Sequence, residues 1–308
     1  MSCACVDIGS DPRYYPAVRL DGGIQAAGNS CFSDAHMPSR SMNISNGQVA
    51  LVVEEAERFS AVIAFSLRYD GRSLPPMHSL NFSTSQGDSP ENVRDNYRVL
   101  GERLDIDTSG IATCRQVHGD TILVVESPPV SPPEADAIIS VKPGVFPAVK
   151  TADCVPVLLL DPVRRISAAV HVGWRGAVLR VLNKVLVAME TRFGSRPSDL
   201  VAALGPAIGP CCYEVDDRVL TPFRKAVPQA DRFITASWSG AADTPERIES
   251  RRIDLVGANR FELTSGGVRG RNIYTADFCT SCRPDLFFSY RRDGAASGRH
   301  IAVTGFRA

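Results

Sequence analysis

The sequence predicts an α+β protein in which mixed β-sheets outnumber the helices. Three observations support this class. Short apolar, β-branched runs bounded by turn residues recur along the chain, only two stretches show helical spacing, and strict βαβ alternation is missing. With 308 residues and 44% hydrophobic content, the chain is long enough to bury a sizeable core.

The N-terminal segment, residues 1–45, differs in composition from the rest. It is rich in Gly, Ser, Asp and Pro and shows no sustained periodicity, so we expect a loosely ordered extension. Met42 is a second candidate start of translation. Residues 46–308 are predicted to form a single domain, with ordered structure beginning near Val49.

The first half of this domain is predicted to consist of strands. A strand is expected at 61–67, and the segments 111–116 and 121–126 flank a His-Gly-Asp turn typical of a hairpin. A Pro-rich loop at 128–133 follows. Buried strands are then expected at 136–140, 155–160 and 166–172.

Two stretches of the second half have helical spacing. Between 176 and 193, one apolar face recurs at three and four residues, consisting of Val178, Val181, Leu182, Val185, Met189 and Phe193. A second helix is expected at 253–263, ended by Gly266-Gly267. The remaining apolar runs predict strands at 200–204, 273–277, 286–290 and 301–306.

Charge and cysteine usage narrow the class of protein. Lys plus Arg and Asp plus Glu both number 34, so the basic excess of a dedicated nucleic-acid binder is missing. No apolar stretch reaches the ~18 residues that span a membrane, and no secretion signal is recognisable. Nine cysteines without such a signal indicate reduced thiols and a cytoplasmic location. Neither a nucleic-acid polymer nor a membrane is therefore expected as a partner, and the oligomeric state is left open.

Two of the five histidines and one cysteine stand where strands end. His118 lies in the turn of Gln116-Val-His118-Gly-Asp120, Cys154 lies where a loop enters a strand, and His171 ends a strand before a helix. Two imidazoles and a thiolate are the ligands of a catalytic zinc site with one open position. The alternative is that the histidines are hydrogen-bonded turn or core residues and the cysteine is a buried small side chain.

Other residues allow a functional and a structural interpretation. Arg175, at a helix start, is either an anion clamp or a member of a surface ion pair. Asn81 either bonds the base or ribose of a substrate or stabilises a turn. We expect Asn81, Gln116 and Arg175 to contact substrate, and Cys154, His171 and Arg175 to take part in catalysis.

Four further cysteines are interpreted as buried thiols. Cys279-Thr-Ser-Cys282 has zinc-like spacing, but Cys211-Cys212 does not, and a second metal site is the less favoured reading. Core packing is likewise favoured over base stacking for Tyr213 and Phe288, and a solvated basic edge is favoured for Arg291-Arg292.

Five motifs in chain order resemble the YfiH-like laccase-domain family. They are QVHGD, TADCVPVLLLDP, AAVHVGWRGAV, LGPAIGPCCYEV, and FCTSC with the following FFSYRRDG. The family is also called polyphenol oxidase, and its members have been described as purine nucleoside phosphorylases with adenosine deaminase activity. The resemblance covers 61–306 and departs from the family at Asn96-Tyr97, where Asn-Arg is usual, and in the loop after the first strand.

The resemblance implies a fold, a metal site and an activity. The fold is an α/β/β/α arrangement of mixed sheets between helical layers, similar to the catalytic part of the cytotoxic necrotizing toxins. The implied zinc ligands are His118, Cys154 and His171. The implied activity is phosphorolysis of adenosine, inosine and methylthioadenosine with phosphate as co-substrate, together with deamination of adenosine.

The residues leave two alternative functions. A laccase-type copper oxidase needs many histidines, commonly in His-X-His pairs, whereas this chain has five and no such pair. Copper is therefore expected only as a substitute for zinc in vitro, because Cu²⁺ is bound more tightly by most donor sets. A hydrolase with a Cys154–His171 dyad, acting in peptidoglycan editing, is the other alternative.

Overall fold

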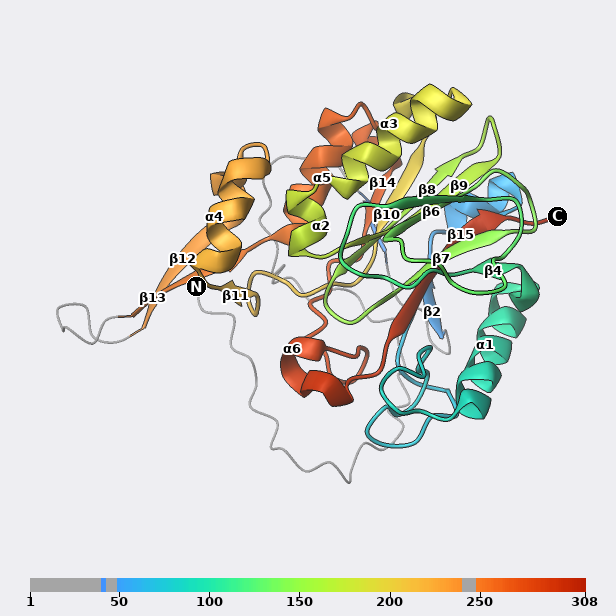
Figure 1. Ribbon diagram of the computed structural model, residues 1–308, viewed down its shortest axis with the longest axis horizontal. Helices are drawn as coiled ribbons and strands as arrows, with labels where there is room; N and C mark the ends of the chain where they lie inside the picture. The colour runs from blue at the N-terminus through green and yellow to red at the C-terminus, as the bar shows by residue number, and fades with distance from the viewer. Residues whose placement is uncertain (1–39, 43–48, 240–247) are drawn as a thin grey trace.

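The computed structural model describes residues 40–42, 49–239 and 248–308 (Figure 1). A seven-stranded sheet has the order β1 (Arg40–Ser41), β14 (Ile273–Thr275), β10 (Val201–Leu204), β8 (Val155–Asp161), β9 (Ile166–Val172), β6 (Ala137–Ser140), β5 (Ile122–Val125). A five-stranded sheet has the order β2 (Ala50–Val52), β3 (Ala61–Ser66), β15 (His300–Phe306), β7 (Phe146–Thr151), β4 (Ile111–Ala112). A small third sheet contains β11 (Glu214–Val215), β13 (Ile248–Ile253) and β12 (Ile234–Ser239).

Six helices are described, of which α1, α3 and α5 cover the outer faces of the two large sheets. The six are α1 (Pro90–Leu104), α2 (Trp174–Val178), α3 (Val181–Phe193), α4 (Asp217–Ala226), α5 (Leu255–Ser265) and α6 (Tyr290–Asp293). In Figure 1, α3 and α5 lie above the seven-stranded sheet and α1 lies beside the five-stranded sheet on the other side of the molecule. The predicted α+β class with sheets between helical layers is therefore confirmed.

Alternation along the strands explains the four layers. In β8, Val157 and Leu159 join the core beneath α3 and α5, whereas Leu158 and Leu160 face the five-stranded sheet. The five-stranded sheet repeats this division, because Ile63 packs between the sheets while its neighbours pack under α1. Successive strand residues point to opposite faces, so a strand that is apolar at every position must be covered on both sides.

The predicted hairpin around His118 is wrong. β4 pairs with β7 in one sheet, and β5 pairs with β6 in the other, both in parallel. Residues 113–121 therefore cross from one sheet to the other. The N–H groups of Val117, His118 and Gly119 donate to the carboxylate of Asp136, which replaces the cross-strand partner that a hairpin would supply.

Two other predicted elements are also corrected. The helix predicted over 176–193 is split into α2 and α3, because Arg180 has a left-handed φ of 57° and breaks the hydrogen-bond ladder. The strand predicted at 286–290 does not form. Phe288 N–H donates to His300 Nε2, and the Phe287 carbonyl accepts from Arg292, so side chains take the bonds that a neighbouring strand would otherwise make.

Helix α1 was missed, although its start carries a clear signal. Ser89 caps the helix by accepting from the Glu91 N–H, and Pro90 occupies the first turn, where its missing N–H costs nothing. Val93, Leu100 and Leu104 form its buried face. The helix therefore closes the outer side of the five-stranded sheet.

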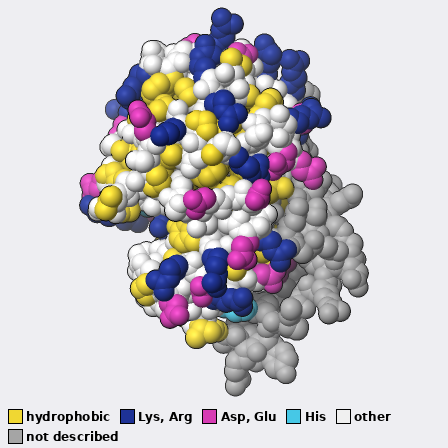
Figure 2. Space-filling view, turned by 90° about the vertical axis from the view of Figure 1, so that its right-hand side faces the viewer, with side chains coloured by type: hydrophobic (Ala, Val, Ile, Leu, Met, Phe, Trp, Pro, Cys, Tyr) yellow, Lys and Arg dark blue, Asp and Glu magenta, His cyan; other side chains and the backbone are white. Residues whose placement is uncertain are grey.

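The described part of the N-terminal segment forms one edge of the seven-stranded sheet. Most of the predicted extension lies outside the described residues, but Arg40 and Ser41 pair in parallel with β14. Among the described helices, none has the length and apolarity needed to cross a bilayer. Positive and negative side chains are interspersed over the face shown in Figure 2, in line with the net charge of zero.

Candidate functional site

One edge of the seven-stranded sheet gathers the predicted site. Residue Pro156 at the start of β8 lies opposite His171 near the end of β9, and β6 begins alongside at Ala137. β10 and β14 end at the same edge, where Leu204 pairs with Thr275. Because neighbouring strands bring their ends together in this way, loops that are distant in sequence meet at one place.

His118, Cys154 and His171 meet at this edge. Their ligand atoms all lie within 4.8 Å of one another. Cys154 Sγ is 3.9 Å from His118 Nε2, and the two imidazole rings are edge-on with centroids 4.9 Å apart. Zinc bonds of ~2.0–2.1 Å to nitrogen and ~2.3 Å to sulfur place tetrahedral N and S ligands about 3.6 Å apart. The three side chains could therefore hold one metal ion with little adjustment.

Asp136 organises two of these three side chains. Its buried carboxylate accepts from His171 Nδ1 at 2.8 Å and from three successive backbone N–H groups of the His118 turn. Because Nδ1 is the donor to this carboxylate, His171 Nε2 is left to face Cys154. His118 itself has a left-handed φ of 59°, which the three bonds to Asp136 compensate.

Close packing around Cys154 leaves no room for an additional side chain. A Cβ on Gly173 would lie 2.9 Å from Cys154 Sγ and 3.2 Å from His118 Cδ2, so only glycine fits there. The preceding residue, Asp153, has φ of 92° and is held by Thr280 Oγ1 and by the Arg291 N–H, each at 2.6 Å. The turn that presents Cys154 is thus fixed from both sides.

The electrostatics of the group favour a thiolate beside an imidazolium. Burial alone would raise the pKa of the Cys154 thiol, but the charge on His171 and hydrogen bonds from both histidines lower this pKa to about 6. Burial alone would lower the pKa of His171, but the Cys154 thiolate and Asp136 raise this pKa to about 9. A thiolate is the form that binds metals or attacks electrophiles.

The group opens into a cavity of about 1020 Å³ between the edges of the two large sheets. Exposure increases outward, because His171 is buried, Cys154 is half-buried and His118 is exposed. The walls carry cationic and aromatic side chains, namely Arg115, Lys150, Tyr213, Tyr290, Arg291 and Arg299. Burial lowers the pKa of Lys150. The cavity therefore combines an anion-attracting wall, flat aromatic surfaces and the His–Cys–His group.

The three predicted substrate residues occupy different places. Gln116 lines the cavity, and its amide bonds both the N–H and the carbonyl of Lys150. Asn81 is fully buried, and its amide bonds Ser83, Asp88 and the Arg299 N–H. Its amide holds the backbone of Ser83 and Arg299, two residues that line the cavity.

Arg175 lies beside the cavity. It stacks on Trp174, with 4.3 Å between the guanidinium carbon and the ring centroid. It lines an adjoining hollow of about 820 Å³, which shares Tyr213 and Arg291 with the main cavity. The helix that it begins, α2, has only five residues.

Several site residues carry little signal in the sequence. Asp136 is predicted there as the start of a strand, and for Arg291 a solvated basic edge is favoured over a position in the pocket, yet Arg291 lines the cavity. Tyr290, which is 54% exposed and lines the cavity, was also passed over, whereas Phe288 is core as expected. Asp136 accepts hydrogen bonds from three successive N–H groups because residues 113–121 cross from one sheet to the other, and no local sequence pattern predicts this crossing.

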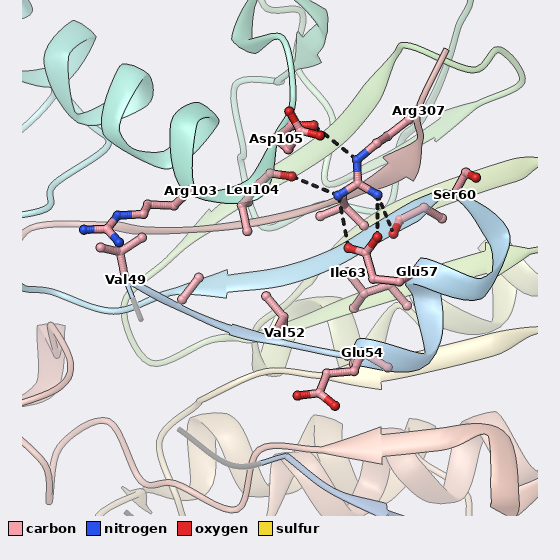
Figure 3. A pocket seen from close by; sticks show the side chains of 14 residues that line it. Val49, Val52, Glu54, Glu57, Ser60, Ile63, Arg103, Leu104, Asp105 and Arg307 are labelled. Carbon is pink, nitrogen blue, oxygen red and sulfur yellow. Dashed lines mark hydrogen bonds and ion pairs between the residues drawn. The ribbon is translucent and has the colours of Figure 1, made fainter. Parts of the chain in front are cut away.

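A second cavity, of about 650 Å³, lies away from this edge and lacks such a group (Figure 3). Its wall includes Arg307, which binds both carboxylate oxygens of Glu57 and the carbonyls of Leu104 and Asp105. Arg307 therefore ties together the β15 end, α1 and the segment before β3.

Comparison with known proteins gives the family of this chain. The family model described as multi-copper polyphenol oxidoreductase laccase matches residues 62–307. The purine nucleoside phosphorylase YlmD of Geobacillus stearothermophilus is 34% identical over 80% of this chain and 90% of its own length. The purine nucleoside phosphorylase YfiH of Escherichia coli is 35% identical over 74% and 87%.

Solved structures give the same result. The crystal structure of YlmD from Geobacillus stearothermophilus has a TM-score of 0.75 and 33% identity, covering 86% of this chain and 98% of that one. The Bacillus licheniformis protein YfiH has a TM-score of 0.75 and 31% identity, covering 84% and 97%. The family match spans most of the sequence and includes all three residues of the His–Cys–His group, so the chain belongs to the multi-copper polyphenol oxidoreductase laccase family.

Proposed function

We propose that this chain is a zinc-dependent purine nucleoside phosphorylase. Its substrates are adenosine, inosine and methylthioadenosine, with deamination of adenosine as a side activity. The observation that carries the proposal is the meeting of His118, Cys154 and His171 on the wall of a cavity rich in arginine and tyrosine. The relatives at 34% and 35% identity are purine nucleoside phosphorylases and supply the reaction class.

The donor set supports zinc as the metal. Two imidazoles and one thiolate leave one position of a tetrahedron open, as in catalytic zinc sites. Zinc bound there would supply a Lewis acid at the cavity wall. Asp136 would keep His171 in the tautomer whose Nε2 binds metal, and Gly173 would leave the space that the ligands need.

The cavity residues suit the two substrates. Arg291 and Arg299 offer guanidinium groups to phosphate, which binds such forks through two parallel hydrogen bonds. Tyr213 and Tyr290 offer ring faces to a purine. In phosphorolysis a phosphate oxygen bonds to ribose C1′, the bond from C1′ to purine N9 breaks, and N9 takes the electron pair and then a proton. Guanidinium groups next to the phosphate hold it in line for this displacement.

One observation favours a second candidate, a hydrolase with Cys154 as nucleophile. The pKa of Cys154 is lowered to about 6 and that of His171 is raised to about 9, which is the charge distribution of a Cys–His dyad. In that scheme His118 only assists His171 in lowering the pKa of the thiol, whereas in a metal site it is a ligand in its own right. The metal site therefore accounts for more of the geometry.

A multi-copper oxidase fits less well. The whole sequence has five histidines, and in the described part of the chain only His118 and His171 share a metal-ligating group. His300 is buried in β15, and burial together with Arg68 lowers its pKa to about 3. A trinuclear copper centre needs more imidazoles than this site contains.

The test measures base release with and without phosphate. The full-length protein, purified without added metal, is incubated with inosine or adenosine, and hypoxanthine, adenine, ribose 1-phosphate and ammonia are quantified. We expect base release to require phosphate and to stop when a chelator removes zinc. Deamination of adenosine should continue without phosphate.

His118→Ala is the matched test variant and His78→Ala is its control. His118 belongs to the His–Cys–His group, whereas His78 is an exposed histidine that does not line the cavity. The first variant should lose activity and the second should keep it. Base release that persists without phosphate, or full activity after complete zinc removal, would reject the proposal and favour the cysteine hydrolase.

A further inference from the structure

Four cysteine side chains converge beside the nucleoside cavity. The sulfur atoms of Cys211, Cys212, Cys279 and Cys282 all lie within 4.8 Å of one another. Cys282 Sγ is 3.5 Å from Cys211 Sγ and 3.4 Å from Cys212 Sγ. The prediction of buried thiols therefore holds for Cys279 alone, and all four cysteines form one cluster.

Sheet topology explains the convergence of two distant segments. β10 and β14 are neighbouring parallel strands, so the loops that follow them leave the same sheet edge. The loops continue side by side, because Ala207 bridges to Cys279 and the Thr280 N–H donates to the Ala207 carbonyl. The Gly209 N–H donates to Cys279 Sγ at 3.2 Å. Residues about 70 positions apart in sequence are thus held in contact.

The distances match a metal tetrathiolate and not a disulfide. A sulfur–sulfur bond is ~2.05 Å long. In a tetrahedral zinc tetrathiolate with Zn–S bonds of ~2.3 Å, neighbouring sulfur atoms are about 3.8 Å apart. The observed separations of 3.4 and 3.5 Å are close to the second value. Four soft sulfur donors in a tetrahedral arrangement are typical of zinc or of iron.

We propose that Cys211, Cys212, Cys279 and Cys282 hold one zinc ion in a closed, structural site. All four positions of the tetrahedron are filled by protein sulfur, so no position is left for water or substrate. The site is separate from the His–Cys–His group, with which it shares no residue.

The surroundings suit the two net negative charges of zinc with four thiolates. Arg291 Nη1 donates to the Cys212 carbonyl, and Arg292 Nη1 donates to the carbonyls of Thr280 and Ser281. Arg291 is anchored through one nitrogen, Nη1, whereas the charge of Arg292 is also paired with the Asp293 carboxylate. The positive charge of Arg291 lowers the cost of collecting four thiolates at a half-buried place.

The zinc ion would hold in place the two loops that support one wall of the cavity. Cys212 precedes Tyr213, which lines the cavity, and Thr280, next to Cys279, donates to Asp153. Asp153 in turn precedes Cys154 and accepts from the Arg291 N–H. Fixing the two loops to one ion thus fixes the turn of Cys154 and the backbone of Arg291. The four cysteines are positioning residues and do not touch substrate.

The first experiment isolates the proposed ion from the His–Cys–His group. The full chain carrying His118→Ala and His171→Ala is expressed in zinc-supplemented medium, and its zinc content and zinc K-edge absorption spectrum are measured. We expect about one zinc per chain, bound by sulfur alone at ~2.3 Å, without the ~2.0 Å nitrogen shell of a histidine site. Wild-type protein should contain about two zinc ions with a mixed shell.

The second experiment removes the cluster. Cys212→Ser with Cys282→Ser should lose one zinc, and Cys114→Ser, a buried cysteine outside the cluster, should lose none. If the double serine variant does not fold, the spectrum of the histidine variant decides by itself. The proposal is overturned if that variant contains no zinc, contains iron instead, or shows a disulfide among the four cysteines. Since neither readout requires nucleoside turnover, failure here is distinct from failure of the proposed phosphorylase activity.

Discussion

The His–Cys–His group and the four-cysteine cluster stand at the same sheet edge but differ in donors and in access. The first offers two nitrogens and one sulfur on the wall of a large cavity, with His118 exposed. The second offers four sulfurs between two loops that run side by side. An incomplete donor set that faces a cavity can accept a substrate, whereas a complete one can only hold structure. The shared sheet edge thus brings each set of side chains together, and the number of donors in a set decides whether a bound metal has an open position for substrate.

Removing one ligand from each group should give the largest contrast. His171→Ala should reduce phosphorolysis by at least about 10³-fold, because loss of several kcal/mol of metal-ion stabilisation corresponds to that factor. Cys282→Ser should reduce it by no more than about tenfold, since a positioning residue acts through geometry. The measurement is kcat/KM for inosine with saturating phosphate. Equal losses in the two variants would abolish the distinction between the groups.

Asp136→Asn should have the next largest effect. The carboxylate orients His171 and holds the His118 turn, and partners of metal-ligating histidines affect metal affinity or activity by about 10–100-fold. We expect weaker zinc binding at the His–Cys–His group and unchanged zinc at the cysteine cluster. Competition with a chelator of known affinity, followed separately for the two ions, measures both. If the cysteine cluster loses its zinc instead, Asp136 affects metal binding at both sites and not at the His–Cys–His group alone.

The pH dependence of Cys154 alkylation sharpens the comparison in metal-free protein. The His171 charge outweighs burial and lowers the pKa of Cys154 to about 6, so the thiolate is present above that pH and is lost as the pH falls. The alkylation rate should rise about tenfold from pH 5 to pH 7, following the thiolate fraction. Peptide mapping after iodoacetamide treatment identifies the residue.

Two comparisons control this experiment. Burial raises the pKa of Cys114 to about 12, so Cys114 should stay unmodified over the same range. Zinc should protect Cys154 by occupying its sulfur. Rapid alkylation with zinc bound would favour the cysteine hydrolase.

Arg175→Ala should have the smallest effect of the four changes. Arg175 stacks on Trp174 and lines the adjoining hollow, not the main cavity, so we expect it to attract phosphate without binding it directly. We expect KM for phosphate to rise about two- to fivefold, as for an exposed charge worth up to ~1 kcal/mol, with kcat nearly unchanged. Steady-state kinetics at varied phosphate measures this. A loss larger than that of Arg299→Ala would place the phosphate at Arg175.

The sequence by itself determined the α+β class and most strands of the two large sheets. The apolar runs that became β3, β8, β9 and β15 are short and β-branched, and local composition is enough to show that such runs are buried. It also singled out His118, Cys154 and His171, because strand ends and turns are marked in the chain itself. The structure brings the ligand atoms of these three residues within 4.8 Å of one another.

Only the tertiary structure decided which segments pair and what their ends enclose. The segments flanking His118 form strands as predicted, yet they join different sheets, because pairing depends on long-range partners and not on local pattern. The bonding of Asp136 and the cavity position of Arg291 follow from that crossing. Among the four cysteines only Cys279 and Cys282 have the spacing of metal ligands, and two parallel strands far apart in sequence bring Cys211 and Cys212 beside them. The spacing of residues in the sequence shows only which side chains are neighbours within one helix or strand, whereas the residues of these two sites come from different strands and loops.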